Sequence, residues 1–202
     1  MSGSRVIALT FDAGGNDAAV ASVLATLQRT GTPATFFLTG NWVGVYPVAA
    51  RAIAARYPVG NHTMTHPDLR TLDDAQVRAE IDRAQSAILA VTGQNPRPYF
   101  RFPYGAVSSH LVSVVNDRCY VPFRWTVDTL GWKGTSGGMS VAAVHDRVLS
   151  GARPGAVVLM HLGSNPDDGT TLDADALPSV IRDLGAAGYR FVTLEAALPA
   201  TP

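Results

Sequence analysis

Two histidines, His62 and His66, lie four residues apart in the stretch GNHTMTHPDL and are two of only five histidines in the chain. Neutral imidazoles at this spacing can reach one metal ion from a helical turn or a tight loop. Gly60 and Pro67, on either side of the pair, favour a loop or single turn. The pair predicts a metal site, and the alternative is two unrelated surface histidines.

Four more groups that can hold charge or move a proton follow short apolar runs. Asp12 ends LTFD, Arg101 opens RFPYG, Asp128 opens DTLGW, and His161 ends VLMH. In a parallel α/β barrel the acting side chains lie at the carboxyl ends of the strands. We therefore expect an acid, a base and a guanidinium on one rim, although each residue alone has a structural alternative such as a turn, surface or core position.

Asp17 has two interpretations. It immediately precedes the helical run that begins at Ala18, so it suits a helix N-cap better than Asp12 does. That interpretation leaves Asp12 available for chemistry. An arginine such as Arg101 near a carboxylate lowers the pKa of that carboxylate and orients it.

Strand-like and helix-like segments alternate along the chain, which favours an α/β fold with a mostly parallel sheet. The expected strands are Val6–Phe11, Ala34–Leu38, Pro58–Asn61, Pro98–Phe102, Tyr120–Val127, Ala156–Met160 and Tyr189–Leu194. The expected helices are Ala19–Arg29, Tyr46–Arg56, Leu72–Val91, Ser108–Asp117, Ser140–Leu149 and Asp173–Ala187. Pro47 suits a first helical turn. Ser140 and Asp173 are the expected N-caps, and Gly151 and Gly188 are the expected helix ends. About seven units predict an irregular, incomplete (β/α) barrel, with an open doubly wound sheet as the rival.

The bulk properties set the class of protein. The chain has 202 residues, 47% hydrophobic and 16% charged, with a formal net charge of zero. We expect a single domain over residues 1–202, no nucleic-acid partner, no membrane span and, by default, a monomer. The single cysteine, Cys119, lies in an apolar run and is expected to be a buried small hydrophobe.

Five stretches in this order resemble the motifs of the polysaccharide deacetylases, carbohydrate esterase family four, also called the NodB homology domain. TFDAG resembles T-F-D-D-G, HTMTHP resembles H-[ST]-x-x-H-P, RFPYG resembles R-x-P-Y-G, DTLGW resembles D-x-x-D-W, and LMH resembles L-x-H. The resemblance runs from Leu9 to about Leu194. It implies an irregular (β/α) barrel that removes N- or O-acetyl groups from carbohydrates.

Carried over position by position, the resemblance implies a role for each motif residue. His62 and His66 would bind a divalent metal ion, Zn²⁺ or alternatively Co²⁺ or Ni²⁺. Asp12 would be the general base and His161 the general acid, with Arg101 orienting Asp12. Acid and base catalysis each contribute roughly 10²–10⁴-fold to such a hydrolysis.

The remaining motif residues would complete the site. Asp128 would tune His161, and the backbone N–H of Tyr104 would help to hold the oxyanion. Trp132 and Leu159 would line the acetyl pocket. For Trp132, a sugar-stacking face and simple core packing are both open from the residues alone.

The chain departs from the family in two places. Ala13 stands where the usual second aspartate supplies the third metal ligand, and Gly131 stands where many members have a second Asp in the fourth motif. Asp17 or Asn16 could turn back across Gly14 and Gly15 to supply an oxygen, water could complete a two-histidine site, or metal and activity could be lost. We expect one of the first two outcomes, with Asp17 as the candidate ligand.

The leading functional hypothesis is a metal-dependent deacetylase acting on peptidoglycan, chitin oligomers or acetylated xylan. The alternatives are a catalytically silent carbohydrate-binding protein on the same scaffold, motivated by Ala13, and a hydrolase of a small non-sugar amide. No signal peptide is visible. The resemblance nevertheless implies a secreted or cell-wall-associated protein.

Overall fold

The computed structural model of the protein describes residues 5–198. This part of the chain forms eight strands: β1 (Val6–Ala13), β2 (Ala34–Leu38), β3 (Val59–Asn61), β4 (Tyr99–Phe100), β5 (Val121–Pro122), β6 (Val127–Asp128), β7 (Ala156–His161) and β8 (Arg190–Phe191). They follow the order β5-β4-β3-β2-β1-β7-β6, and β8 pairs with β1. The registers of β1 with β8, β2 with β3, β3 with β4, β4 with β5 and β6 with β7 are all parallel, as expected from the alternating pattern.

Helices lie in the connections between consecutive strands, as is usual for a parallel sheet, except between β5 and β6. The α-helices are α1 (Val20–Thr30), α2 (Gly40–Val45), α3 (Pro47–Ala54), α4 (Asp74–Thr92), α5 (Ser109–Asn116), α6 (Val141–Gly151) and α7 (Leu172–Ala186). Residues 5–198 also contain four short 3₁₀ turns, η1 (Leu69–Thr71), η2 (Pro103–Gly105), η3 (Gly131–Lys133) and η4 (Leu194–Ala197). No helix of the described part of the chain is long and apolar enough to cross a membrane.

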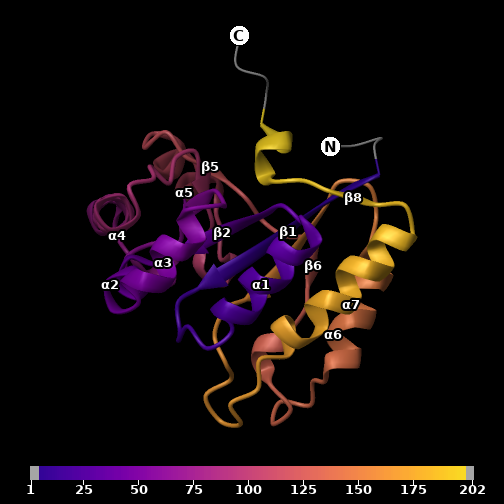
Figure 1. Ribbon diagram of the computed structural model, residues 1–202. Coiled ribbons are helices and arrows are strands. Elements are labelled where there is room, and N and C mark those ends of the chain that lie inside the picture. The colour runs from indigo at the N-terminus through magenta and orange to yellow at the C-terminus, as the bar shows by residue number, and fades with distance from the viewer. Residues whose placement is uncertain (1–4, 199–202) are drawn as a thin grey trace. The chain divides into compact units, whose positions relative to one another are not determined.

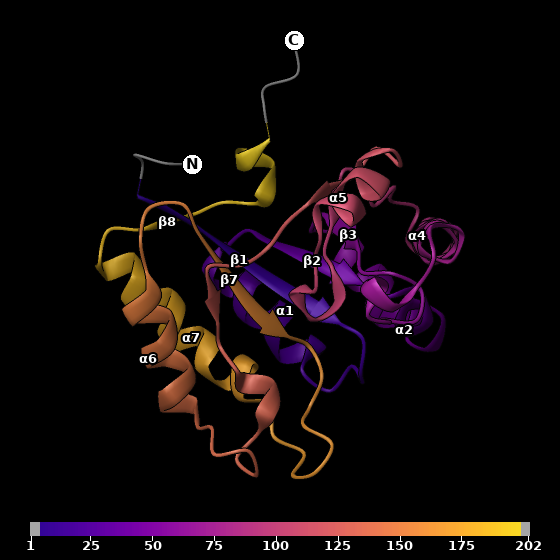
Figure 2. The same ribbon diagram turned by 180° about the vertical axis from the view of Figure 1, so that it is seen from behind.

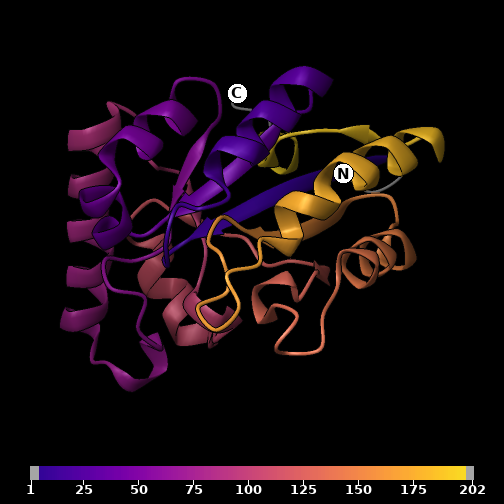
Figure 3. The same ribbon diagram turned by 60° about the horizontal axis from the view of Figure 1, so that its bottom comes forward.

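The chain divides into two compact units. Unit 1 comprises residues 1–11, 15–35 and 125–202, and unit 2 comprises residues 12–14 and 36–124. In unit 1, helices α6 and α7 run side by side, as both Figure 1 and Figure 2 show. Helix α1 packs along α7 in the same unit, visible in Figure 3 as the indigo helix beside the yellow one.

Unit 2 has its own apolar core beneath α4 and α5. The cluster comprises Leu69, Val77, Ile81, Phe100, Phe102, Leu111, Val114, Val115 and Tyr120, all at most 4% exposed. Helix α4 begins with a capping box, in which the Asp73 side chain accepts from Gln76 N–H and the Gln76 side chain accepts from Asp73 N–H. Burial raises the pKa of Tyr120 to about 12, so its phenol stays protonated and hydrogen-bonded to Asn61, at the end of β3.

Several expected boundaries differ from the structure. The predicted strand Tyr120–Val127 is two strands, because β5 pairs with β4 whereas β6 pairs with β7. Helix α2 was not predicted, since six residues that include two glycines show no clear helical period. Cys119 is exposed in a left-handed conformation, so the expectation that it is buried is wrong.

The helix ends also confirm and correct specific predictions. Ser140 caps α6 by accepting from Ala143 N–H at 3.1 Å, as predicted. Asp173 is not an N-cap, because α7 begins one residue earlier and Thr171 holds that position. Asp17 does not cap α1 either, because Ala19 is the N-cap and no side chain caps that helix.

One titratable group joins α6 to α7. His145 on α6 contacts Asp146 at 3.0 Å and Asp183 of α7 at 2.9 Å. Hydrogen bonds to these two carboxylates raise the pKa of His145 above its usual value of 6.5. The contacts of His145 therefore stabilise the folded protein fully at pH values below the pKa of His145 in the unfolded chain. This stabilisation is lost as the pH rises through the higher pKa of His145 in the folded protein.

We expect the H145Q variant to lose stability relative to the wild type at about pH 6 and to match it more closely at about pH 9. Urea unfolding of both proteins at the two pH values measures the difference. A stability difference that does not change with pH would show that protonation of His145 makes no contribution.

Candidate active site

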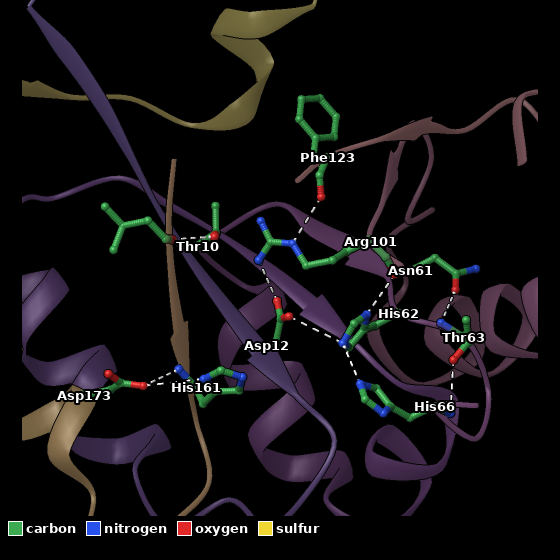
Figure 4. Close-up of polar contacts among 11 residues, drawn as sticks. Thr10, Asp12, Asn61, His62, Thr63, His66, Arg101, Phe123, His161 and Asp173 are labelled. Carbon is green, nitrogen blue, oxygen red and sulfur yellow. Dashed lines mark hydrogen bonds and ion pairs between the residues drawn. The ribbon is translucent and has the colours of Figure 1, made fainter. Parts of the chain in front are cut away.

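Unit 2 contains a buried ion pair between the first and third motifs. Asp12 near the end of β1 is 7% exposed, and Arg101, directly after β4, is fully buried. Arg101 Nη1 donates to Asp12 Oδ1 at 2.7 Å, and Arg101 Nε donates to the Phe123 carbonyl at 3.3 Å (Figure 4). The guanidinium also lies over the Phe37 ring, 4.1 Å from its centroid. Arg101 is thus fixed on three sides and holds the Asp12 carboxylate in one orientation.

The charge state of this pair follows from its burial. Desolvation lowers the pKa of Arg101, and the adjacent Asp12 carboxylate opposes that effect. A guanidinium starts from a pKa so high that it stays charged in proteins. A charged arginine at 2.7 Å favours the ionised form of Asp12.

The two motif histidines face each other in the same unit. His62 Nε2 lies 3.1 Å from His66 Nε2 and 3.4 Å from Asp12 Oδ2, as Figure 4 shows. His62 Nδ1 lies 2.9 Å from the carbonyl oxygen of Arg101. A carbonyl can only accept, so Nδ1 carries the hydrogen and a neutral His62 presents the Nε2 lone pair to His66 and Asp12.

A tight loop after β3 sets this arrangement. Thr63 and His66 both have positive φ, 68° and 61°. Thr63 N–H donates to Asn61 Oδ1 at 2.8 Å, and His66 N–H donates to Thr63 Oγ1 at 3.0 Å. Asn61 is held in turn by donating to the Ile81 carbonyl. These hydrogen bonds hold two residues in a left-handed conformation that L-residues rarely adopt.

Tyr104 approaches the histidines from the third motif. It has a φ of 58° inside η2, and its ring makes an edge contact with His66 at 4.6 Å between centroids. The residue is 69% exposed. Its aromatic face is therefore open to solvent beside the histidine pair.

The donor chemistry in unit 2 suits a positive ion. The Nε2 lone pair of His62 has the Asp12 carboxylate oxygen on one side and His66 Nε2 on the other, and these groups need a proton or metal cation near them. A metal-binding histidine usually donates its other N–H to a carbonyl or carboxylate, as His62 does. The described residues contain no complete group of three His, Cys, Asp or Glu side chains that could hold a metal ion.

Ala13 is the reason this donor set is short of a ligand. It is fully buried at the end of β1, and its carbonyl accepts from Thr39 N–H at 3.0 Å. Its methyl group cannot coordinate a metal. The two histidines therefore supply nitrogen ligands that suit a metal ion, but the carboxylate ligand of the family motif is missing.

The suggested substitutes for that ligand, Asn16 and Asp17, lie in unit 1. Asn16 Oδ1 accepts from Ser164 N–H at 2.8 Å and from Ala18 N–H at 3.1 Å, so its amide oxygen already has two donors. The Asp17 side chain makes no hydrogen bond with other described residues. Asp17 remains the predicted ligand, because its carboxylate oxygens accept fewer hydrogen bonds from the described residues than the amide oxygen of Asn16 does.

His161, the predicted acid, is paired within unit 1. It ends β7, and its backbone N–H donates to Asp173 Oδ2 at 2.8 Å (Figure 4). The same oxygen lies 3.6 Å from His161 Nδ1. Asp128, which was expected to tune His161, instead accepts from Leu130 N–H at 2.9 Å in its own turn. The structure pairs His161 with Asp173 rather than with Asp128.

The predicted pocket residues of unit 1 have contrasting environments. Trp132 on η3 is 48% exposed, which excludes simple core packing, and the Lys133 ammonium lies 5.7 Å from the centroid of its ring. Leu159 on β7 is 3% exposed and pairs in register with Asp128.

Asp173 was missed as a site residue because its place before an apolar helix resembled an N-cap. Sequence spacing alone offered no signal for its pairing with His161.

Known proteins with similar sequences support one family. The polysaccharide deacetylase family model matches residues 2–121. The chain is 32% identical over 189 residues to a peptidoglycan-N-acetylglucosamine deacetylase of Bacillus cereus, covering 93% of this chain and 66% of the relative. It is 37% identical over 168 residues to a chitooligosaccharide deacetylase of Rhizobium leguminosarum bv. trifolii, covering 83% of this chain and 76% of the relative. The chain thus spans just under two thirds of the Bacillus cereus relative.

Solved structures confirm the expected fold. The Bc1960 peptidoglycan N-acetylglucosamine deacetylase has a TM-score of 0.88 and 30% identity, covering 97% of this chain and 89% of the other. A CE4 family pseudoenzyme from Bacillus anthracis has a TM-score of 0.87 and 29% identity, covering 97% of this chain and 66% of the other. The similarity confirms the NodB-like (β/α) barrel of parallel strands that the motifs predicted.

Proposed function

Since the chain belongs to the polysaccharide deacetylase family, we propose that it hydrolyses acetyl groups from a glycan that contains N-acetylglucosamine. The observation that supports this most is the buried Asp12–Arg101 pair beside the facing nitrogens of His62 and His66. It provides an ionised, oriented base next to a cation-binding donor pair. These are the two devices that amide hydrolysis at neutral pH needs most.

The residues of the chain have separate parts in the proposed reaction. Asp12 takes a proton from the attacking water, and Arg101 keeps its carboxylate ionised and oriented. The water oxygen bonds to the acetyl carbonyl carbon, and the carbon–nitrogen bond then breaks. His161 gives its proton to the departing nitrogen, so the products are acetate and a free amine. The backbone N–H of Tyr104 is proposed to bind the carbonyl oxygen as charge develops on it.

We assign the divalent metal, Zn²⁺ or alternatively Co²⁺ or Ni²⁺, to His62 and His66, with Asp17 proposed as the third ligand. When bound, such an ion polarises a carbonyl and makes water more acidic. The His62 Nδ1 hydrogen bond to the Arg101 carbonyl orients the ring for this task. With Ala13 in place of a carboxylate, the affinity is expected to be weaker than that of a site with three protein ligands.

The substrate is proposed from the relatives and from two exposed aromatic rings. The relatives are named for peptidoglycan and for chitooligosaccharides, both of which contain N-acetylglucosamine. Tyr104 and Trp132 are 69% and 48% exposed, and aromatic faces of this kind can stack on sugar rings. A cell-wall or extracellular glycan, and therefore a secreted or wall-associated location, fits these features. Acetylated xylan is the alternative substrate for the same chemistry.

A second candidate function is carbohydrate binding without turnover. It is favoured by Ala13, which removes a metal ligand, and a pseudoenzyme of the same family shares the fold. Under this alternative, oligosaccharide binding would survive both chelation and the H161A substitution.

We expect acetate release from N-acetylglucosamine oligomers that increases with Zn²⁺ or Co²⁺ and falls with chelator. Enzymatic measurement of acetate gives the rate, and calorimetry with the same oligomers gives the binding. H161A should reduce release while leaving binding in place, because it removes the proton donor. Binding with no release from these oligomers or from acetylxylan under any metal condition would favour the silent alternative.

A further inference from the structure

His161 and Asp173 form a close pair within unit 1. One oxygen of Asp173, Oδ2, accepts the backbone N–H of His161 at 2.8 Å and lies 3.6 Å from Nδ1 of the same residue. The Asp173 side chain is 4% exposed, whereas the His161 side chain is 29% exposed. A buried carboxylate thus contacts both the backbone and the inner side of an imidazole that solvent can reach.

The position of Asp173 explains how its charge is tolerated. It lies in the first turn of α7, where the partial positive charge of the helix N-terminus stabilises an anion. The Asp173 Oδ1 atom has no hydrogen-bond partner among the described residues. A buried carboxylate with an unsatisfied oxygen is costly, so a cationic neighbour is the partner that would compensate it best.

Gly131 makes the room that this carboxylate occupies. A Cβ at position 131 would overlap Oδ1 and the carboxyl carbon of Asp173. No positive φ is required at Gly131, so the space rather than the backbone conformation explains the glycine. Position 131 is also where the fourth motif commonly has an aspartate. In this chain, an acid from α7 fills the volume beside that position.

The other charged groups near β7 in unit 1 have different partners. From β6, Asp128 accepts from Leu130 N–H, and from η3, Lys133 lies over the Trp132 ring. The part of β1 in unit 1 has no charged residue, and Asp175 on α7 is exposed. Among the described residues of unit 1, the acidic side chain of Asp173 lies at ion-pair distance from His161.

We infer that Asp173 is the positioning residue of His161. Its carboxylate faces Nδ1 at 3.6 Å and stabilises the imidazolium by its charge, which leaves Nε2 as the atom that releases the proton. After that release the neutral ring keeps its hydrogen on Nδ1, facing Asp173. This inference rests on the proposed function for its catalytic meaning, but the pairing itself can be measured without any turnover.

The decisive experiment is a ¹⁵N NMR pH titration of His161 in the wild type and three variants. In D173N, and in G131A, where the new methyl group displaces the carboxylate, the titration midpoint of His161 should move to lower pH. The matched control is D175N, which removes an exposed acid from the same helical turn and should leave the midpoint unchanged. In the wild type, the neutral ring should be protonated on Nδ1.

Kinetics add a second readout. If the proposed function holds, D173N should lower kcat roughly tenfold or more with little change in KM, because the loss lies in proton transfer. An unchanged His161 midpoint in D173N, an equal shift in D175N, or a wild-type neutral ring protonated on Nε2 would overturn the inference. If D173N does not fold, G131A and the wild-type tautomer still decide it. Absence of turnover in the wild type would count against the proposed function alone.

Discussion

Replacing Asp12 by asparagine is expected to lower the deacetylase kcat by roughly 10²–10⁴-fold, because an amide cannot accept the proton that a carboxylate base removes from water. Asparagine has nearly the same shape and keeps an oxygen for the Arg101 N–H. The loss should therefore be in kcat, measured by acetate release, with substrate binding retained. Activity within tenfold of the wild type would contradict the assignment of Asp12 as base.

The same substitution should lower the free energy of unfolding by several kcal/mol, roughly 3–5, because it leaves the fully buried Arg101 charge without its counter-charge. Urea unfolding measures this. D12N combined with R101M removes both charges and should be more stable than D12N alone. The control is D68N, which breaks the exposed Asp68–Arg70 pair and should change stability little. Equal effects of D12N and D68N would show that burial of the pair has no energetic consequence.

Replacing Ala13 by aspartate is expected to tighten zinc binding by about tenfold or more, which corresponds to about 1.4 kcal/mol. Ala13 is fully buried at the strand end that precedes the site, and the substitution adds the carboxylate that the family motif has there. Competition with a chromophoric chelator measures the affinity. Without metal, the buried charge should destabilise A13D, so its Tm should rise more with zinc than that of the wild type.

The control for this prediction is A13N, which has nearly the same size without the charge. It should bind zinc less tightly than A13D. Equal zinc affinity in the wild type and A13D would show that position 13 is not the missing coordination position. In that case D17A becomes the informative variant, because loss of zinc binding in D17A would identify Asp17 as the ligand that replaces the family aspartate.

Much of unit 2 could be predicted from local patterns. The boundaries of β2 agree with its apolar run, and Pro47 begins α3 as its fixed φ favours. Asp12, His62 and Arg101 each follow a strand-forming run, and parallel strands bring their carboxyl ends to one edge. That they lie at one edge therefore follows from strand direction, which the alternating pattern already indicates, whereas the order of the strands is known only from the structure.

Other features depended on partners that are distant in sequence. The run from Tyr120 to Val127 is mostly apolar, with Arg124 and Thr126 inside it, but it splits between β5 and β6 because its two ends pair with different strands. Hydrophobicity does not say which strand a segment pairs with. Helix α2 was missed for a related reason, since the burial of Trp42 and the Thr39 cap compensate for its two glycines.

The order and spacing of five short motifs were enough to identify the family, the fold and the missing carboxylate at Ala13, because these depend on residue type and strand order. The tertiary structure alone showed which acid faces His161. From sequence, Asp128 and Asp173 were both acids beside expected elements, one assigned to tuning and the other to capping. The choice between them depends on how α7 packs against β7 and on the space left by Gly131, and neither is a property of a local stretch.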